Sequence, residues 1–138
     1  MEKRFYFDTS IWLDFFEKRD EPNLLKGQFI TKLISKILEN DDRIVYSEVV
    51  KNEMIEMGYT RYEVDDLFFS LRHVLIYTES DKKQFGKAKD LSKKRDIPLF
   101  DALHALLARD SRSILITRDW HFSKILDIIK ARKPEEFI

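Results

Sequence analysis

The sequence predicts a three-layer α/β fold in which helices cover both faces of a mainly parallel sheet of four or five strands. Short β-prone runs alternate four times with longer segments whose apolar residues have helical spacing. Such alternation builds parallel strands that are joined by right-handed crossovers. A length of 138 residues is enough for one hydrophobic core, so we expect residues 1–138 to form a single domain.

The strands are predicted from short runs of aromatic and branched residues that end at polar or turn-forming residues. These runs are residues 4–7, 43–46, 73–77 and 113–117, with 136–138 as a small edge strand. The first run begins almost at residue 1, and the opening MEKRFYFD lacks the apolar stretch of a signal peptide.

The helices are predicted from apolar residues three and four positions apart, with start and stop signals at their ends. They span residues 11–17, 24–39, 48–57, 61–72, 81–95, 101–112 and 119–130. The polar residues 8–10 and Ser47 suit N-caps, and Pro98 suits the first turn of the helix that carries Asp101.

The charge balance excludes a protein whose whole surface attracts nucleic acid. Lys and Arg total 25, and so do Asp and Glu, so any surface for nucleic acid must be local. The chain has no cysteine, which excludes disulfides and thiolate zinc sites and fits a cytoplasmic protein. No apolar run approaches the roughly 20 residues of a membrane span, and we expect no membrane partner.

Two aspartates follow the ends of predicted strands. Asp8 comes directly after the first strand, and Asp119 comes two residues after the fourth. In a parallel sheet the ligand crevice lies beyond the carboxyl ends of the strands, so we expect both carboxylates there. Either residue alone could instead serve as a helix cap.

Two further acids lie on helices that we expect to be buried. Asp101 opens a helix that is apolar on nearly every side, and Glu53 shares the inward face of Val49 and Val50. Burying an unpaired charge costs far more than a helix cap returns, so these carboxylates need a partner. Glu48 is the alternative to Glu53 because it is nearer to the strand end, but it shares a polar face, and we prefer Glu53.

Together these four acids predict a divalent metal site. Like charges in one cleft repel each other unless their pKa values rise or a cation neutralises them. Oxygen ligands without cysteine suit hard ions, so the predicted cofactor is one or two Mg²⁺ or Mn²⁺ ions. Such ions activate water and stabilise the charge that builds on a phosphate during in-line attack. Arg118, beside Asp119, is our candidate for a contact with a substrate phosphate.

Four segments carry a family resemblance. They are FDTS at 7–10, YSEVVKNEM at 46–54, PLFDALHALLA at 98–108 and LITRDWHF at 115–122. In this order and spacing they resemble the PIN-domain nucleases, and among these the small VapC-like toxin ribonucleases of type II toxin–antitoxin systems. The resemblance implies a PIN-like fold over residues 1–138, with Asp8, Glu53, Asp101 and Asp119 as the catalytic, metal-binding acids. It implies supporting hydroxyls at Thr9, Ser10 and Thr117.

The same resemblance implies a function. It points to a Mg²⁺- or Mn²⁺-dependent endoribonuclease that cuts structured RNA such as tRNA, forms a homodimer and is inhibited by a cognate antitoxin. Two positions depart from the family pattern. Ser10 stands where the family usually has Asn, and His121 stands where many members have a further acid. The second departure bears on whether a second metal ion is bound.

The main alternative is a catalytically silent PIN-like module that binds RNA or protein. A surface that only binds RNA gains nothing from clustered negative charge, so the four acids favour the enzyme. A flap-type or other DNA nuclease is less favoured, because the short chain has no arch-like insertion. His104, one turn after Asp101, is predicted to be a satisfied core histidine, with a hydrogen bond to Asp101 as the alternative.

Overall fold

A computed structural model describes residues 1–138 and shows a five-stranded sheet in the order β3-β2-β1-β4-β5. Every neighbouring pair of strands is parallel. The strands are β1 (Arg4–Phe7), β2 (Arg43–Ser47), β3 (Leu75–Thr78), β4 (Ile114–Ile116) and β5 (Ala131–Arg132). The predicted α/β class and parallel sheet are therefore confirmed.

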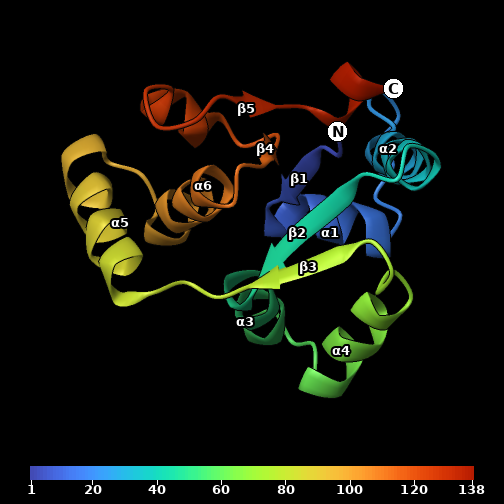
Figure 1. Ribbon diagram of the computed structural model, residues 1–138, viewed down its shortest axis with the longest axis horizontal. Helices are drawn as coiled ribbons and strands as arrows, with labels where there is room; N and C mark the ends of the chain where they lie inside the picture. Colours follow the sequence, from blue (N-terminus) through green and yellow to red (C-terminus); the bar gives the residue numbers. More distant parts are fainter.

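The chain moves away from β1 in both directions. After β1 it builds β2 and β3 on one side, and it then crosses back to build β4 and β5 on the other side. The strand order thus reverses at β1, and ligand crevices of parallel sheets lie outside the carboxyl ends of strands at such a switch point. Figure 1 shows β1 in the middle of the sheet and both chain ends at its upper edge.

Helices cover both faces of the sheet (Figure 1). The helices are α1 (Thr9–Phe16), α2 (Lys26–Glu39), α3 (Glu48–Glu56), α4 (Arg61–Phe69), α5 (Lys82–Arg95) and α6 (Leu99–Asp110). In β1, alternation sends Phe5 and Phe7 into a core with residues of α1, α2 and α4, and Tyr6 into a second core with α5 and α6. Helix α3 adds Val50 to the first core and Val49 to the second. It therefore lies where the two layers meet.

The helices that leave the sheet start at polar caps. Asp8 is the N-cap of α1 and accepts from the backbone N–H of Ile11 at 3.1 Å, and Ser47 is the N-cap of α3. Capping boxes begin α4 at Thr60 and α5 at Asp81. Each cap satisfies amides that the first helical turn leaves unpaired. Helix α6 has no side-chain cap and instead follows Pro98.

The C-terminal part of the chain differs from the prediction. The helix expected over 119–130 is a 3₁₀ helix, η1 (Trp120–Ile125), that buries Phe122 and Ile125. Residues three apart lie on one face of a 3₁₀ helix, so this short element buries both side chains. The edge strand expected at 136–138 is wrong, since residues 134–137 form a second 3₁₀ helix, η2 (Pro134–Phe137). The fifth strand is β5, which is too short for periodicity to reveal.

The remaining boundaries shift by a few residues. Strand β3 starts at Leu75 rather than at residue 73, and α6 starts at Leu99 rather than at Asp101. None of the helices combines the length and the apolar character that crossing a bilayer would require.

Candidate active site

A cavity of about 300 Å³ lies at the carboxyl ends of β1 and β4. Its ten lining residues include all four predicted acids, and they are Asp8, Thr9, Ser10, Leu13, Arg19, Glu53, Met57, Asp101, His104 and Asp119. The acids come from four different parts of the fold: the end of β1, helix α3, the first turn of α6 and the segment after β4. The fold thus brings Asp8 and Asp119, which are more than a hundred residues apart in the sequence, to the same cavity.

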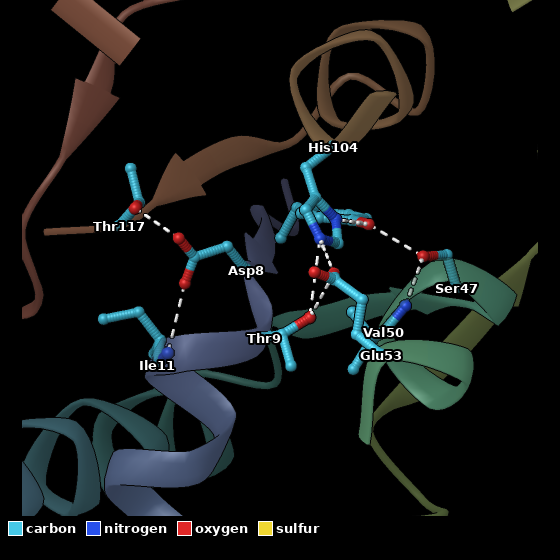
Figure 2. A network of polar contacts seen from close by, with 9 residues as sticks. Asp8, Thr9, Ile11, Ser47, Val50, Glu53, His104 and Thr117 are labelled. Atoms are coloured by element: carbon cyan, nitrogen blue, oxygen red, sulfur yellow. Dashed lines mark hydrogen bonds and ion pairs between the residues drawn. The ribbon is translucent and has the colours of Figure 1, made fainter. Parts of the chain in front are cut away.

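Asp8 is held in place by two hydrogen bonds (Figure 2). One carboxylate oxygen accepts from the backbone of Ile11, and the other accepts from the hydroxyl of Thr117. The Thr117 hydroxyl oxygen also accepts from the backbone N–H of Asp119 at 3.0 Å, which ties the ends of β1 and β4 together. Burial raises the pKa of Asp8 to about 6, despite the hydrogen bond from Thr117.

Glu53 is oriented by side chains from two other helices. Its Oε1 accepts from Thr9 of α1 at 2.7 Å and lies 2.6 Å from Nε2 of His104 on α6, and Figure 2 shows the three side chains pointing toward one another. Burial works to raise the pKa of Glu53, but the hydrogen bond and charge of His104, with the hydrogen bond from Thr9, outweigh it and lower the pKa. Glu53 is therefore held as a carboxylate with a defined orientation.

A buried polar chain continues behind Glu53. His104 is 1% exposed, and its Nδ1 lies 2.7 Å from the hydroxyl of Tyr6, which lies 2.7 Å from Oγ of Ser47. Because a carboxylate only accepts, Nε2 of His104 carries a proton that it donates to Glu53. Burial raises the pKa of Tyr6 far above its usual value, so this hydroxyl keeps its proton. The chain runs from Ser47 through Tyr6 and His104 to Glu53, and every member has a partner.

This role of His104 was only partly predicted. The expectation of a satisfied core histidine describes its burial, but its partner is Glu53 and no hydrogen bond joins it to Asp101. The signal in the sequence was a polar residue on an apolar helix one turn after an acid. Tyr6 gave no such signal, because aromatic residues are common in strands.

Asp101 and Asp119 form the second half of the site together with His121. Nδ1 of His121 lies 2.7 Å from Oδ1 of Asp119 and 3.5 Å from Oδ2 of Asp101. Burial raises the pKa of Asp101 to about 7, and the charge of Asp119 adds to the rise. One ligand atom from each of the three residues lies within 4.8 Å of the others. Two carboxylates and an imidazole with this spacing fit a divalent cation, which would relieve the repulsion that raises the pKa.

A comparison with known protein families decides what this site belongs to. The family model for the PIN domain matches residues 5–127, which is most of the chain. The chain belongs to the PIN domain family. The resemblance stated from the four sequence segments is thereby confirmed, and no curated protein matches the sequence.

Solved structures share the fold of this PIN domain. VapBC-1 from nontypeable Haemophilus influenzae has a TM-score of 0.69 at 20% identity, covering 96% of this chain and 98% of the other. VapBC2 from Rickettsia felis, bound to a DNA fragment from their promoter, has a TM-score of 0.67 at 14% identity, and the match covers 94% of this chain and 98% of the other. A toxin–antitoxin complex from Klebsiella pneumoniae has a TM-score of 0.63 at 20% identity, and the match covers 94% of this chain and 97% of the other. At such identities the likeness establishes the fold.

The remaining predicted site residues of the PIN domain lie in different surroundings. Ser10 lies on the cavity wall and is exposed. Glu48 does not line this cavity and accepts from the backbone N–H and hydroxyl of Ser80 at 2.9 and 2.8 Å. Arg118 is paired with Glu135 of η2, with nitrogen–oxygen distances of 2.9 and 2.8 Å, and is absent from the cavity wall. A contact of Arg118 with substrate stays a prediction that would require this pair to open.

Proposed function

We propose that this PIN domain is a Mg²⁺- or Mn²⁺-dependent endoribonuclease that hydrolyses RNA phosphodiester bonds, and that it is the toxin of a toxin–antitoxin pair. The observation that carries the proposal is the convergence of Asp8, Glu53, Asp101 and Asp119 on one small cavity. The raised pKa values of Asp8 and Asp101 support a site for a bound cation, since burial and, at Asp101, the charge of Asp119 disfavour bare carboxylates there.

Each acid has a role that its surroundings support. Asp101 and Asp119, with the imidazole of His121, would hold one cation, and Asp8 faces the same cavity from β1. Glu53 is kept ionised by His104 and Thr9, so it can bind a cation directly or through water. A divalent ion in such a site supplies an activated water and stabilises charge on the phosphate. The Thr117 hydroxyl keeps Asp8 oriented toward that position.

The alternative is a silent PIN-like module that binds RNA or protein without cutting. Without a cation, the clustered carboxylates would repel a phosphodiester, so the site would weaken the very binding that this alternative requires. The buried chain behind Glu53 favours the enzyme as well, because an exact carboxylate orientation matters for chemistry more than for adhesion.

The partners follow from the same proposal. The similar solved structures are of toxin–antitoxin complexes, which supports a cognate antitoxin protein for this chain. We propose that one PIN domain over residues 1–138 acts in the cytoplasm, as a homodimer, on RNA such as tRNA.

The proposal is tested by incubating purified protein with labelled cellular RNA in Mg²⁺, in Mn²⁺ and in EDTA. We expect discrete products that need the metal and that Asp8→Asn and Asp101→Asn each reduce at least a hundredfold, on the order of what one group acting in catalysis contributes. Asp66→Asn, an exposed aspartate of α4, is the matched control and should cut like the wild type. Cleavage that persists in both site variants would reject the four-acid site. Metal-binding calorimetry on the same proteins separates a silent module from an enzyme with a narrow substrate.

A further inference from the structure

Trp120 is a large aromatic side chain beside the acidic cavity that the folded core does not use. It is 65% exposed, whereas Trp12, the other tryptophan of the chain, is fully buried. Trp120 opens η1 directly after Asp119, which lines the cavity. Consecutive Cα atoms are about 3.8 Å apart, so the backbone of Trp120 lies next to a residue of the cavity wall.

The indole is connected to the acids through its neighbour. Its ring stacks on His121, with centroids 4.2 Å apart and planes inclined by 29°. His121 in turn lies 2.7 Å from Asp119 through Nδ1. The ring is therefore ordered in the free protein, and a ligand that stacks on it loses little conformational entropy.

A positive charge lies over the same ring in a cation–π contact. The ammonium of Lys124 is 5.0 Å from the indole centroid and is anchored by a hydrogen bond to the backbone oxygen of Asp96 at 2.8 Å. An aromatic surface beside a cation, at the edge of a site for a phosphodiester, matches the chemistry of a nucleotide. The base offers a π-face, and the adjoining phosphate offers a negative charge.

From this geometry we propose that Trp120 is a stacking platform for a nucleobase next to the phosphodiester bond that is cut, with Lys124 near the adjoining phosphate. This role rests on the proposed function, because it takes the acids as the position of the reacting phosphate. A base inside a duplex has both faces covered by its neighbours. Trp120 therefore selects RNA that is unpaired at the cleavage position, since only unstacked bases can lie on an aromatic side chain.

The test measures binding apart from cleavage. All proteins carry Asp101→Asn and are titrated in Mg²⁺ with a labelled oligoadenylate, either as a single strand or paired to oligouridylate. Trp120→Ala should weaken binding of the single strand about 5- to 150-fold, as expected for one lost base–aromatic stack, and leave duplex binding unchanged. Trp120→Tyr should retain most of the affinity. Tyr62→Ala, which removes an aromatic side chain that is 79% exposed on α4, should match the parent protein.

Tryptophan fluorescence adds a readout that is specific to this residue. Trp12 is inaccessible, so quenching by the single strand should come from Trp120 and disappear in Trp120→Tyr. Equal affinity of Trp120→Ala and its parent, quenching that persists in Trp120→Tyr, or no binding of the single strand would each overturn the proposal. Equal affinity of Trp120→Ala and its parent would indicate that the exposed indole contacts a protein partner instead of a base.

Failure of this proposal and failure of the proposed function give different results. If the wild type cuts RNA and the Trp120→Ala variant binds the single strand normally, only the stacking platform is rejected. If binding depends on Trp120 but the wild type cuts no RNA, the nuclease is rejected and Trp120 stays a platform for an unpaired base that is bound and not cut.

Discussion

Glu53 illustrates how single residues prepare this site. Its carboxylate is hydrogen-bonded by Thr9 and His104, which belong to α1 and α6. His104 is in turn oriented by Tyr6 of β1 and, through it, by Ser47 at the end of β2. A hydrogen-bonded chain of this kind determines the orientation of the last group, and each member that is removed leaves another one unpaired.

Replacing the buried hydroxyl in the middle of this chain should destabilise the protein. Tyr6→Phe keeps the packing of the ring but leaves Nδ1 of His104 and the Ser47 hydroxyl without their partner. We expect the free energy of unfolding in urea to fall by about 1–3 kcal/mol. Tyr62→Phe removes a hydroxyl from an exposed side chain and should change it by less than about 0.5 kcal/mol. If the two variants were equally stable, the chain would contribute nothing to folding.

At the scale of elements, the sequence-based prediction succeeded where strong local signals agree. The caps at Asp8 and Ser47 mark the starts of α1 and α3, and Pro98 precedes α6. The prediction failed after β4, where η1 and the two-residue β5 have no periodicity of their own. Their conformation depends on tertiary contacts, such as the pairing of β5 with β4 and the burial of Phe122.

Two glycines in helices should respond in opposite directions to the same change. A Cβ on Gly27 of α2 would lie 3.0 Å from backbone atoms of Lys18, whereas a Cβ on Gly86 of α5 would meet nothing within 4 Å. Gly86→Ala should raise the free energy of unfolding by about 0.5–1 kcal/mol, because alanine favours the helix. Gly27→Ala gains the same preference but forces α2 away from the turn that follows α1, so we expect a net loss of about 1–3 kcal/mol. Urea unfolding of both variants measures the difference, and stabilisation by Gly27→Ala would contradict the close approach of α2 to the turn after α1.

At the scale of the whole molecule, the acids that converge on the cavity come from both ends of the chain. Their common position could be predicted, because strand ends in a parallel sheet meet at one edge. The partners of each acid could not be predicted in the same way. The pairing of Arg118 with Glu135 depends on where η2 lies in the fold, and the hydrogen bond from Ser80 to Glu48 depends on the path of the chain after β3. These contacts are set by the tertiary fold, and no local pattern encodes them.

The same convergence couples the stability of the whole molecule to pH and metal. Burial, with the charge of Asp119, raises the pKa of Asp101 to about 7, and burial raises that of Asp8 to about 6, whereas an unfolded aspartate has a pKa of about 3.9. Between these values the folded protein keeps protons that the unfolded chain has lost. The contribution of these two groups to the stability of the metal-free protein should therefore fall as pH rises from about 4 to 7, and the fall is complete above the folded pKa values.

A divalent ion should reverse this loss, because it binds the folded carboxylates and stabilises by about 2.7 kcal/mol at a hundredfold excess over its Kd. We expect the Tm in EDTA to fall as pH rises through this window, and Mn²⁺ or Mg²⁺ to restore it near neutral pH. Asp101→Asn should flatten the pH dependence, raise the metal-free Tm near neutral pH and lose most of the response to metal, since the strained carboxylate and a ligand disappear together. Asp66→Asn should follow the wild type throughout. A wild-type Tm that rises over the window in EDTA would show that burial does not strain these acids, and a Tm that responds to neither metal would show that they are not a cation site.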